Sequence, residues 1–320
     1  MKPCEGSFVV FICIIHLSSA PPLAYVFLNF HNCDHNPDAS LLSRTFSTLT
    51  GFVDVIIMVD NASSNRDFLI RLCGSYGNCD FLEVGFNSGV AHALRIGVKY
   101  AVERYNPQWL LFLDDDSTPL RDAMPTLIKI LRKMPNQVGA VRISPGSGDC
   151  RIYDDRYGMF SGTFIRSSVA LRACCRDDFF LDQADLDMYF RVRELGYRTL
   201  FVNCKLLDHR LGVKAWIPVI SHRYGGPVDY EPPWRLYYIA RNSTVLLLEG
   251  KIDSITYLLQ LINWGLKGIL RDRGKAIKAV SLGIMHGLLK ELGYLTQRNL
   301  KKYTLSTGYG LVKEGQGFAA

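Results

Sequence analysis

Three widespread sequence signatures are missing from this chain of 320 residues, and each absence excludes a class of protein. There is no GxGxxG turn, which disfavours a dinucleotide-binding fold, and no GxxxxGK[ST] loop, which disfavours a P-loop NTPase. The cysteines form no CxxC pair, so the spacing of a structural zinc site is also missing. The apolar run Phe8–Ile15 near the N-terminus is too short to span a bilayer.

Disulfide pairing finds little support in the sequence, although nine cysteines are many. Their number is odd, and Cys174 and Cys175 are neighbours in the chain, which seldom bridge each other. We expect most of the cysteines to be buried as small apolar side chains. Cys73 and Cys79 are close enough along the chain to bridge, and this pair stays open as an alternative.

Most of the chain has no net charge, and the net positive charge is concentrated at the C-terminal end. Residues 251–320 hold 11 Lys and Arg against 4 Asp and Glu, whereas residues 1–250 hold 26 of each sign and are neutral. A basic segment indicates an anionic partner, and we expect a membrane surface or a lipid phosphate rather than a nucleic acid. The overall composition, with 48% apolar and 21% charged residues, is typical of a chain that buries a core.

The first 22 residues are interpreted as an extension outside the main domain. Lys2, the apolar run Phe8–Ile15 and the small residues at 18–20 together resemble a secretory signal. A short membrane-touching extension and a start codon placed too early are the alternatives. The remaining chain divides into a main domain over residues 23–230 and a basic, partly amphipathic helical region over residues 231–320.

The middle of the chain alternates between strand-like and helix-like segments. Short apolar runs predict strands, and apolar residues at helical spacing predict helices. The expected strands cover residues 25–30, 53–59, 81–84, 109–113, 138–143 and 200–202, and the expected helices cover residues 41–49, 90–105, 123–133 and 179–193. The alternation predicts an α/β fold with a mostly parallel, Rossmann-like sheet flanked by helices, in which ligands bind beyond the carboxyl ends of the strands.

Three consecutive carboxylates, at residues 114–116, follow the predicted strand 109–113 and are the most informative feature of the sequence. Like charges held a few ångströms apart repel one another. A divalent cation relieves this repulsion, and hard oxygen ligands suit Mg²⁺ or Mn²⁺. Taken alone, the cluster is also compatible with a solvated acidic turn. A second Asp-tipped strand upstream, ending at Asp60, and a histidine downstream, His209, favour the metal site.

The C-terminal region combines apolar helices with a basic rim. Apolar residues at helical spacing predict helices over residues 234–249, 252–270 and 279–292. Four cations follow the second of these helices: Arg271, Arg273, Lys275 and Lys278. An apolar face with a basic rim is typical of a helix at a membrane surface, so peripheral membrane contact through residues 252–292 is one interpretation. Packing of the same face against the main domain is the other.

Seven short motifs, in this order along the chain, resemble glycosyltransferase family 2, the inverting enzymes of GT-A fold. The chain is most similar to the rhamnosyltransferase-like group of that family, over roughly residues 23–250. The motifs are Val59-Asp60-Asn61-Ala62-Ser63, Asn87-Ser88-Gly89-Val90-Ala91, Leu111-Phe112-Leu113-Asp114-Asp115-Asp116, Ser161-Gly162-Thr163, Asp185-Leu186-Asp187 with Arg191 and Gly196, His209, and Arg241-Asn242. Each motif alone is weak, and their common order makes the signal specific.

The resemblance implies that a sugar is transferred from a nucleoside diphosphate, and it assigns most of the candidate site. Asp114 and Asp116 would hold the metal ion, with His209 as a third ligand. The residues expected to bind the donor are Asp60, Asn61, Asn87, Gly89, Asp114 and Asp115. Asn87 and Gly89 open a helix whose N-terminal amides favour anions. An ordinary helix cap remains the alternative for Asp60 and for Asn87.

The resemblance also assigns a general base, because the acceptor hydroxyl loses its proton as it attacks. Asp185 falls at the family's base position, six residues before Arg191. The family often has a glutamate just before this aspartate, and Ala184 occupies that position here, which leaves Asp182 as an alternative base. Arg191 and Arg241 are expected to contact the acceptor or a phosphate, with an ion pair to an acid as the alternative.

A phosphatase of the haloacid dehalogenase class is the main competing function, since Asp114-x-Asp116-x-Thr118 satisfies its DxDxT pattern with Asp114 as nucleophile. That motif normally follows the first strand, whereas here it lies more than a third of the way along the chain. A sugar nucleotidyltransferase needs a glycine-rich basic loop after its first strand, which residues 29–36 do not provide. A non-catalytic binding module has no use for both a metal cluster and a separate base.

We therefore expect a metal-dependent inverting glycosyltransferase that moves one sugar to a hydroxyl of a glycan or polyprenyl-linked acceptor. The expected cofactor is Mg²⁺ or Mn²⁺, and the expected donor is a dTDP- or UDP-sugar, with rhamnose as the first candidate. The basic helices suggest a cytoplasmic protein, peripheral at the inner face of the cell membrane, that acts on a cell-surface polysaccharide or a lipid-linked glycan.

Overall fold

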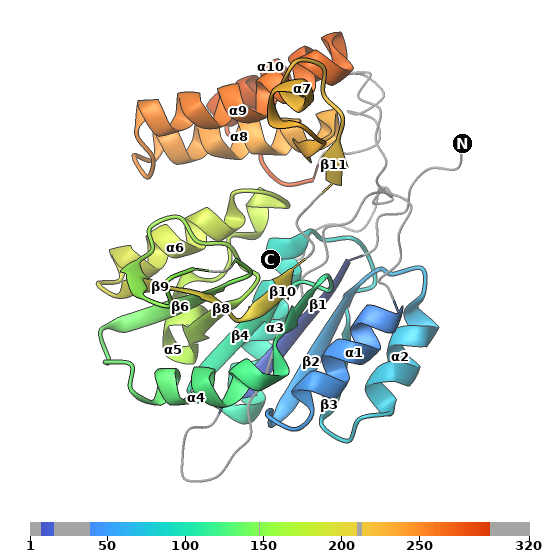
Figure 1. The fold of residues 1–320 in the computed structure, drawn as a ribbon, viewed down its shortest axis with the longest axis vertical. Helices are drawn as coiled ribbons and strands as arrows, with labels where there is room; N and C mark the ends of the chain where they lie inside the picture. The colour runs from blue at the N-terminus through green and yellow to red at the C-terminus, as the bar shows by residue number, and fades with distance from the viewer. Residues whose placement is uncertain (1–7, 16–38, 147, 210–212, 295–320) are drawn as a thin grey trace.

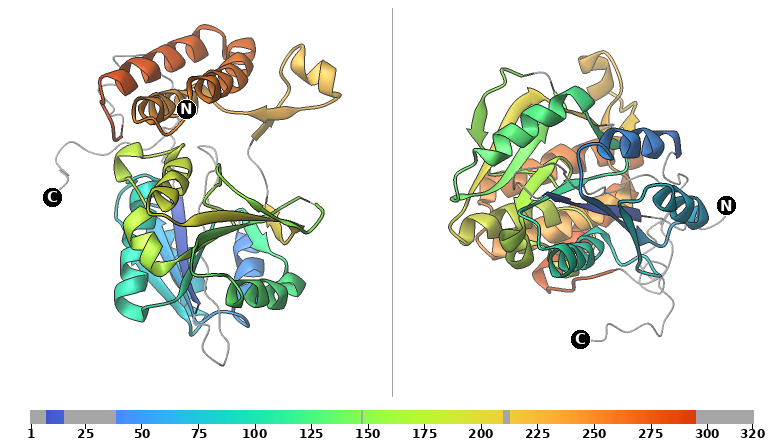
Figure 2. Two further views of the ribbon diagram at one scale, coloured as in Figure 1. Left: turned by 90° about the vertical axis from the view of Figure 1, so that its left-hand side faces the viewer. Right: turned by 90° about the horizontal axis from the view of Figure 1, so that it is seen from below.

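The computed structural model describes residues 8–15, 39–146, 148–209 and 213–294. It has two parts: a sheet with helices around it, and a layer of three helices from the C-terminal region at the top of Figure 1. The left view of Figure 2 shows the same separation. The predicted strand at residues 25–30, the loop at 29–36 and the boundary after residue 22 lie outside the described residues.

The main sheet has eight strands in the order β3-β2-β1-β4-β8-β6-β9-β7. In chain order they are β1 (Phe8–Ile15), β2 (Val55–Asn61), β3 (Cys79–Glu83), β4 (Trp109–Leu113), β6 (Val138–Ser144), β7 (Ile152–Asp154), β8 (Thr163–Arg166) and β9 (Arg198–Lys205). Two short pairs form separate sheets: β5 (Ser117–Pro119) with β10 (Leu207–His209), and β11 (Val213–Ala215) with β12 (Val228–Tyr230).

The α/β architecture is confirmed, but the sheet is mixed where a mostly parallel one was predicted. Among the described strands, only the pairs β2–β3 and β6–β9 are parallel. Strand β8 inserts between β4 and β6 and runs antiparallel to both. Its four residues are too few to give a clear period-two pattern, so the sequence analysis did not predict this strand.

The apolar run Phe8–Ile15 forms β1 and lies between β2 and β4, antiparallel to each. This run was predicted from the sequence to lie in an extension outside the main domain, and the structure places it inside the sheet. Eight residues are a common length for a strand. Pairing on both edges satisfies its backbone N–H and C=O groups, which a free apolar extension would leave to water.

The helices of the main domain pack around this sheet and close its core. They are α1 (Ala39–Leu49), α2 (Arg66–Gly74), α3 (Val90–Tyr105), α4 (Met124–Arg132), α5 (Ser167–Ala173) and α6 (Ala184–Glu194). The short helix α7 (Ile220–Tyr224) lies beside the C-terminal helices instead (Figure 1). The predicted bounds of α1, α3, α4, β2, β4 and β6 hold within two residues. All five residues of β4 are buried, so the segment before the acidic cluster lies in the core.

The C-terminal layer consists of α8 (Pro233–Leu248), α9 (Ser254–Asp272) and α10 (Gly274–Leu288), and it confirms the predicted helical region. Its helices approach each other closely at glycines. A Cβ added to Gly283 would lie 2.4 Å from the Tyr237 carbonyl oxygen, and one added to Gly287 would lie 2.7 Å from the Arg241 carbonyl oxygen. The separation of α8 and α10 therefore depends on residues without side chains.

Helix α9 directs its large aliphatic side chains outward. Six of them are between 38% and 71% exposed: Ile255, Leu258, Leu259, Ile262, Leu266 and Ile269. The fully buried residues of this helix are Gly265 and Gly268. Packing against the main domain, one of the two interpretations of this stripe, is therefore wrong for these side chains. None of the described helices combines the length and the apolar character needed to cross a bilayer.

Three cysteine pairs are bonded in the described part of the chain. Cys73–Cys79, the pair left open by the sequence, is one of them. Cys150–Cys204 and Cys174–Cys175 are the others, so the expectation that adjacent cysteines stay unpaired is wrong. Cys150 and Cys204 meet because β7 pairs with β9, a contact between segments distant in the sequence.

Candidate active site

The carboxyl ends of β2 and β4 lie at the same edge of the sheet, as predicted for the two Asp-tipped strands. Both strands pair with β1 in the same direction, with Asp60 opposite Val9 and Leu113 opposite Phe11. A β-strand rises about 3.3 Å per residue, so positions two residues apart along β1 are close together. Asp60 and the acidic segment after Leu113 therefore leave the sheet at neighbouring positions.

Ser161 holds the acidic segment where it leaves β4. The backbone N–H of Asp114 donates to Ser161 Oγ at 3.2 Å, and Ser117 Oγ lies 2.7 Å from the same oxygen. Gly162, with φ of +79°, donates its N–H to the Phe112 carbonyl at 2.8 Å. A side chain other than hydrogen is rare at this φ, so the glycine lets the turn come this close to the strand.

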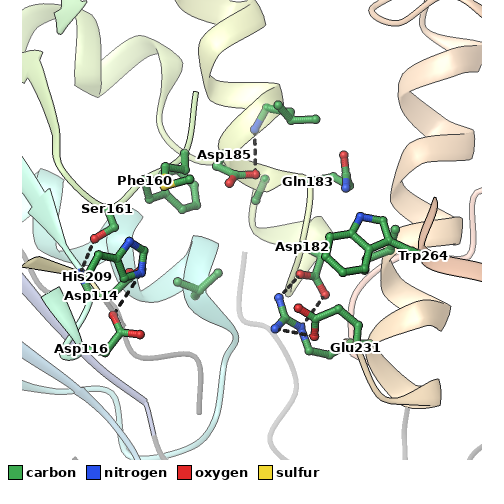
Figure 3. A pocket seen from close by; sticks show the side chains of 16 residues that line it. Asp114, Asp116, Phe160, Ser161, Asp182, Gln183, Asp185, His209, Glu231 and Trp264 are labelled. Atoms are coloured by element: carbon green, nitrogen blue, oxygen red, sulfur yellow. Dashed lines mark hydrogen bonds and ion pairs between the residues drawn. The ribbon is translucent and has the colours of Figure 1, made fainter. Parts of the chain in front are cut away.

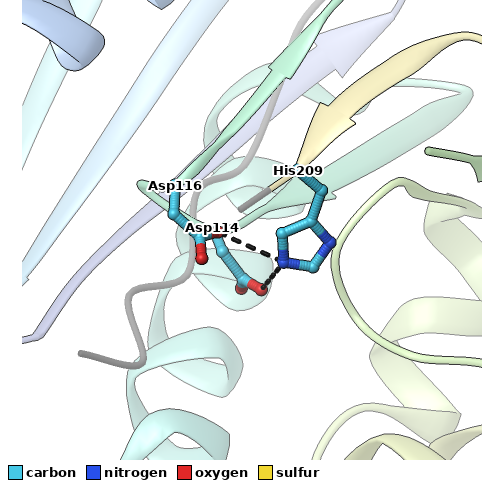
Figure 4. Close-up of side chains that lie close together, drawn as sticks. All are labelled: Asp114, Asp116 and His209. Carbon is cyan, nitrogen blue, oxygen red and sulfur yellow. Dashed lines mark ion pairs between the residues drawn. The ribbon is translucent and has the colours of Figure 1, made fainter. Parts of the chain in front are cut away.

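His209 reaches the acidic segment through a strand pair that the sequence did not predict. Strands β5 and β10 are antiparallel, with His209 opposite Ser117. His209 Nε2 lies 3.3 Å from Asp116 Oδ1 and 3.8 Å from Asp114 Oδ2 (Figure 4). One ligand atom from each of the three residues lies within 4.8 Å of the others. The structure thus brings together the three residues predicted to bind a metal ion.

These three residues fit a divalent cation by their donor chemistry. Two carboxylates suit Mn²⁺ or Mg²⁺, and an imidazole is a common ligand of divalent transition metals. Burial, together with the nearby charges of Asp116 and Asp115, raises the pKa of Asp114 well above its ordinary value. Asp114 Oδ1 is buried and has no hydrogen-bond partner among the described residues. A cation at this point would satisfy that oxygen and offset the repulsion.

A cavity of about 320 Å³ extends from the Asp114–Asp116–His209 group to the C-terminal helices (Figure 3). Asp185 lines the same cavity. The candidate metal ligands and the candidate base therefore line one cavity.

Asp185 lies in the first turn of α6 and is half-buried. Its Oδ1 accepts a hydrogen bond from the Leu186 N–H at 2.9 Å. Burial is the main cause that raises the pKa of Asp185 to about 6. A carboxylate with this pKa is still ionised at neutral pH and binds a proton more strongly than an exposed aspartate does. This environment suits a general base.

Arg191 contacts an acid instead of the cavity. Its Nε lies 2.6 Å from Oδ2 of Asp187, which is fully buried. Arg176 and Lys251 also approach Asp187, at 3.7 and 2.6 Å. Arg191 is not among the residues that line the described cavity. The ion pair, which was the alternative for Arg191, is what the structure has.

Asp60 is buried at the end of β2 and stabilises the turn that follows. Its Oδ1 accepts a hydrogen bond from the Ser63 N–H at 2.9 Å. The N-cap position of the next helix, α2, is Asn65, so Asp60 does not cap that helix. Burial raises the pKa of Asp60, and its Oδ2 has no hydrogen-bond partner among the described residues.

The Asn61 and Asn87 side chains connect the end of β2 to the start of α3. Asn61 Oδ1 accepts hydrogen bonds from both the N–H and the Oγ of Ser88 at 2.9 Å, and Asn87 Oδ1 accepts one from the Gly89 N–H at 3.2 Å. At this helix start, where an anion site was predicted, a backbone carbonyl of the protein already accepts a hydrogen bond. The first N–H of α3 donates to the Phe180 carbonyl at 2.9 Å.

Arg241 is buried in α8 and does not line the cavity. Its guanidinium donates to the backbone carbonyls of Asp178, Phe179 and Gly293. The Asn242 amide donates to the carbonyls of Phe179, Leu181 and Asp182 at 2.6 to 3.0 Å. The described contacts of Arg241 are thus neither to an acid nor to the cavity. Together the two residues hold the loop that precedes α6.

Sequence reasoning missed a polar group that the C-terminal region adds to the cavity. Arg235 lies 2.5 Å from Asp182 Oδ1 and 2.7 Å from Glu231 Oε2. Burial raises the pKa of Glu231 to about 7, although Arg235 acts in the opposite direction. Trp264, from α9, stands beside them (Figure 3). No motif marks Arg235, Glu231 or Trp264, and the one signal was the acidic group that contains Asp182.

The phosphatase alternative gains nothing from the structure. Strand β4, which precedes Asp114, follows β2 and β3 in the described chain, so the DxDxT-like segment does not come after a first strand. Thr118 lies in β5, and its hydroxyl is hydrogen-bonded to Thr45 Oγ1 at 2.5 Å. The Asp182 alternative for the base is also weakened, because Arg235 already pairs with that carboxylate.

Residues 26–176 match the family described as Glycosyl transferase family 2. The match covers a little under half of the chain and supports a glycosyltransferase. The matched range contains Asp60, Asn87 and the acidic segment after β4, whereas Asp185 and His209 lie beyond it. In the GT-A type fold of this glycosyltransferase, α6 and the β5–β10 pair bring Asp185 and His209, which lie outside the matched range, to the sheet edge inside it.

Two solved structures are similar to the glycosyltransferase at low sequence identity. TarS residues 1–349 from S. aureus align with a TM-score of 0.48 and 11% identity, covering 78% of this chain and 79% of that one. GalNAc-T7, solved with UDP, GalNAc and Mn²⁺, aligns with a TM-score of 0.44 and 14% identity, covering 72% of this chain and 53% of that one. Among curated proteins, none matches the chain.

Proposed function

We propose that the glycosyltransferase moves one sugar from a nucleoside diphosphate to a hydroxyl group, with inversion, in a metal-dependent single displacement. One observation carries the proposal: the Asp114–Asp116–His209 group and Asp185 line the same cavity. The reaction needs charge neutralisation at the leaving group and proton removal at the attacking group. A metal site and a separate carboxylate within one cavity provide both.

The donor diphosphate lies, in this proposal, at the Asp114–Asp116–His209 group. Mg²⁺ or Mn²⁺ bound there would neutralise the charge that the leaving diphosphate gains in the transition state. Asp60 binds the base or ribose of the donor through Oδ2, the oxygen without a described partner. The other donor-binding candidates shape the sheet edge around it: Asn61, Asn87, Gly89 and Asp115.

Asp185 acts as the base on the acceptor side. The acceptor hydroxyl oxygen forms a bond to the anomeric carbon while the bond from that carbon to the phosphate oxygen breaks. The hydroxyl proton moves to the Asp185 carboxylate, and the electron pair of the broken bond leaves with the diphosphate. Arg241 and Asn242 act on this step indirectly, by holding the loop that leads into α6.

Rhamnose is the first candidate for the transferred sugar, from dTDP- or UDP-rhamnose, because the motifs are most similar to the rhamnosyltransferase-like group. The acceptor is a hydroxyl of a glycan or of a polyprenyl-linked glycan. The exposed apolar stripe of α9 and the basic residues that follow it support a peripheral position at the inner face of the cell membrane. A product destined for a cell-surface polysaccharide fits that position.

A thermal-shift panel tests the donor site. The purified chain is heated with dTDP, UDP, GDP or ADP, each with and without Mn²⁺, and Asp116→Asn is compared with the unaltered protein. We expect one nucleoside diphosphate to raise Tm only when Mn²⁺ is present, and the Asp116→Asn variant to lose that rise. A panel without any nucleotide-dependent shift in the unaltered protein contradicts the proposed function.

A further inference from the structure

The part of the cavity farthest from the candidate metal ligands is built by the C-terminal region together with the loop before α6, and it has its own chemistry. Figure 3 shows Asp182, Glu231 and Trp264 together, across the cavity from Asp114, Asp116 and His209. Asp185 lines the space between the two groups in the same view. In the proposed reaction, the side of the base opposite the metal is where the acceptor enters.

Arg235 fixes the two carboxylates of this group. Its Nη2 and Nε face the two oxygens of Asp182, at 2.5 and 3.3 Å, and its Nη1 lies 2.7 Å from Glu231. The carboxylates are only 9% and 12% exposed. Two carboxylates fixed by one guanidinium keep further lone pairs for hydroxyl donors, and such charge-assisted hydrogen bonds are strong.

The backbone that carries Asp182 is held in an unusual conformation. Phe180, Asp182 and Gln183 all have positive φ, at 49°, 53° and 62°. Non-glycine residues in this region cost free energy and persist when the surroundings impose them, often at functional sites. Here Asn242 imposes the conformation through its hydrogen bonds to three carbonyls of the loop. The result is that Asp182 and Gln183 both line the cavity.

We propose that Asp182, Glu231, Arg235 and Trp264 form the subsite for the acceptor sugar, and that this sugar carries no negative charge. The inference rests on the proposed function and adds the acceptor class to it. Carboxylates bind sugar hydroxyls, and the indole offers an apolar surface to the C–H face of a sugar ring. On the acceptor side of the cavity, the acids Asp182, Asp185 and Glu231 outnumber the single cation Arg235, so an anionic acceptor would meet repulsion.

Three octyl glycosides serve as acceptor probes: the neutral octyl glucoside and octyl galactoside, and the anionic octyl glucuronide. Release of nucleoside diphosphate is followed with rhamnose linked to the nucleoside diphosphate that the thermal-shift panel identifies. We expect a neutral glycoside to accelerate release at least tenfold more than the glucuronide does. Equal acceleration by the glucuronide, or no acceleration by either neutral glycoside, overturns the inference.

Variants locate the effect in the subsite. We expect Trp264→Ala and Glu231→Gln to raise the KM for the neutral glycoside at least tenfold, with a smaller change in kcat, and Trp264→Phe to raise it less. Trp216→Ala, an exposed tryptophan outside the cavity, is the matched control and keeps the KM. An unchanged KM in Trp264→Ala and Glu231→Gln overturns the inference.

The nucleotide-dependent rise in Tm separates the two proposals. If the unaltered protein shows this rise but no response to neutral glycosides, only the acceptor subsite is wrong. If the rise itself is missing, the proposed function is wrong. Measured on each variant, the same rise reports whether the donor side of the cavity is still folded.

Discussion

At the scale of single residues, the proposed chemistry depends most on Asp185. We expect Asp185→Asn to lower kcat by about 10²- to 10⁴-fold, the range that positioned acid–base catalysis contributes. The amide has nearly the same shape but cannot accept the proton. Turnover is measured with the donor and a neutral glycoside, and Asp122→Asn, an acid outside the cavity, serves as the control. Normal turnover in Asp185→Asn removes this residue from the base role.

The pKa of Asp185 gives the reaction a predictable acid limb. Because burial raises that pKa to about 6, the reactive carboxylate is present above pH 6 and is lost as the pH falls below it. We expect log kcat/KM to decrease with a slope approaching one below about pH 6. Glu231, with a pKa of about 7, faces the same cavity, so the profile is repeated on Glu231→Gln. If the decrease at low pH disappears in Glu231→Gln, the titrating group is Glu231 and not Asp185.

At the scale of elements, the loop before α6 depends on one buried side chain of α8. Asn242→Ala removes the side-chain donor for three backbone carbonyls. A buried polar group left without its hydrogen-bond partner costs about 1–3 kcal/mol of stability. We expect the free energy of unfolding to fall by about 2 kcal/mol, as measured by urea denaturation. Leu248→Ala, half-exposed on the same helix, is the control and changes stability little.

The outer face of α9 makes a second prediction at this scale. Leu259 and Ile262 are 61% and 57% exposed, and a bilayer would bury them. We expect the protein to sediment with vesicles that contain phosphatidylglycerol more than with pure phosphatidylcholine, and the double variant Leu259→Asp/Ile262→Asp to lose most of this binding. Asn263→Asp adds a charge to the same helix and is the control. Equal sedimentation of all variants contradicts membrane contact through α9.

The elements also show which predictions the sequence supports. Strand β4 and helix α3 have the predicted bounds, because a buried apolar run and a helical period are local patterns. The β5–β10 pair is a contact between two three-residue segments distant in the chain, and neither segment carries a period. His209 was found only through its place in the motif order. The start of α6 was placed five residues too early, because nothing local indicates the positive φ of Asp182 and Gln183.

The candidate site follows the same division. Asp114, Asp116 and Asp185 were predicted by type and order, and all three line one cavity. Arg241 was assigned to a phosphate or the acceptor, and its donors instead satisfy backbone carbonyls, which leave no trace in a sequence. Arg235 and Trp264 were missed because their place in the cavity depends on how the C-terminal helices are placed against the main domain.

At the scale of the whole molecule, one buried carboxylate ties the C-terminal region to the main domain. Asp187 is fully buried against Arg176, Arg191 and Lys251, and Lys251 lies just beyond α8. Asp187→Asn removes the negative charge that these three cations share, although Arg176 and Lys251 keep their contacts with Glu249, and breaking a buried pair costs about 3–5 kcal/mol. We expect a loss of that order in denaturant unfolding. Asp154→Asn, an exposed ion pair with Arg198, is the control and costs at most about 1 kcal/mol.

The close approach of α8 and α10 has a consequence for engineering. At Gly283 and Gly287 even a methyl group would overlap backbone atoms of α8, the helix that carries Arg235, Arg241 and Asn242. In a library that randomises α10 and is selected for activity, these two codons should return as glycine, while the exposed positions of the same helix diversify. The position of α8, and with it the acceptor side of the cavity, thus depends on two glycines that do not line the cavity.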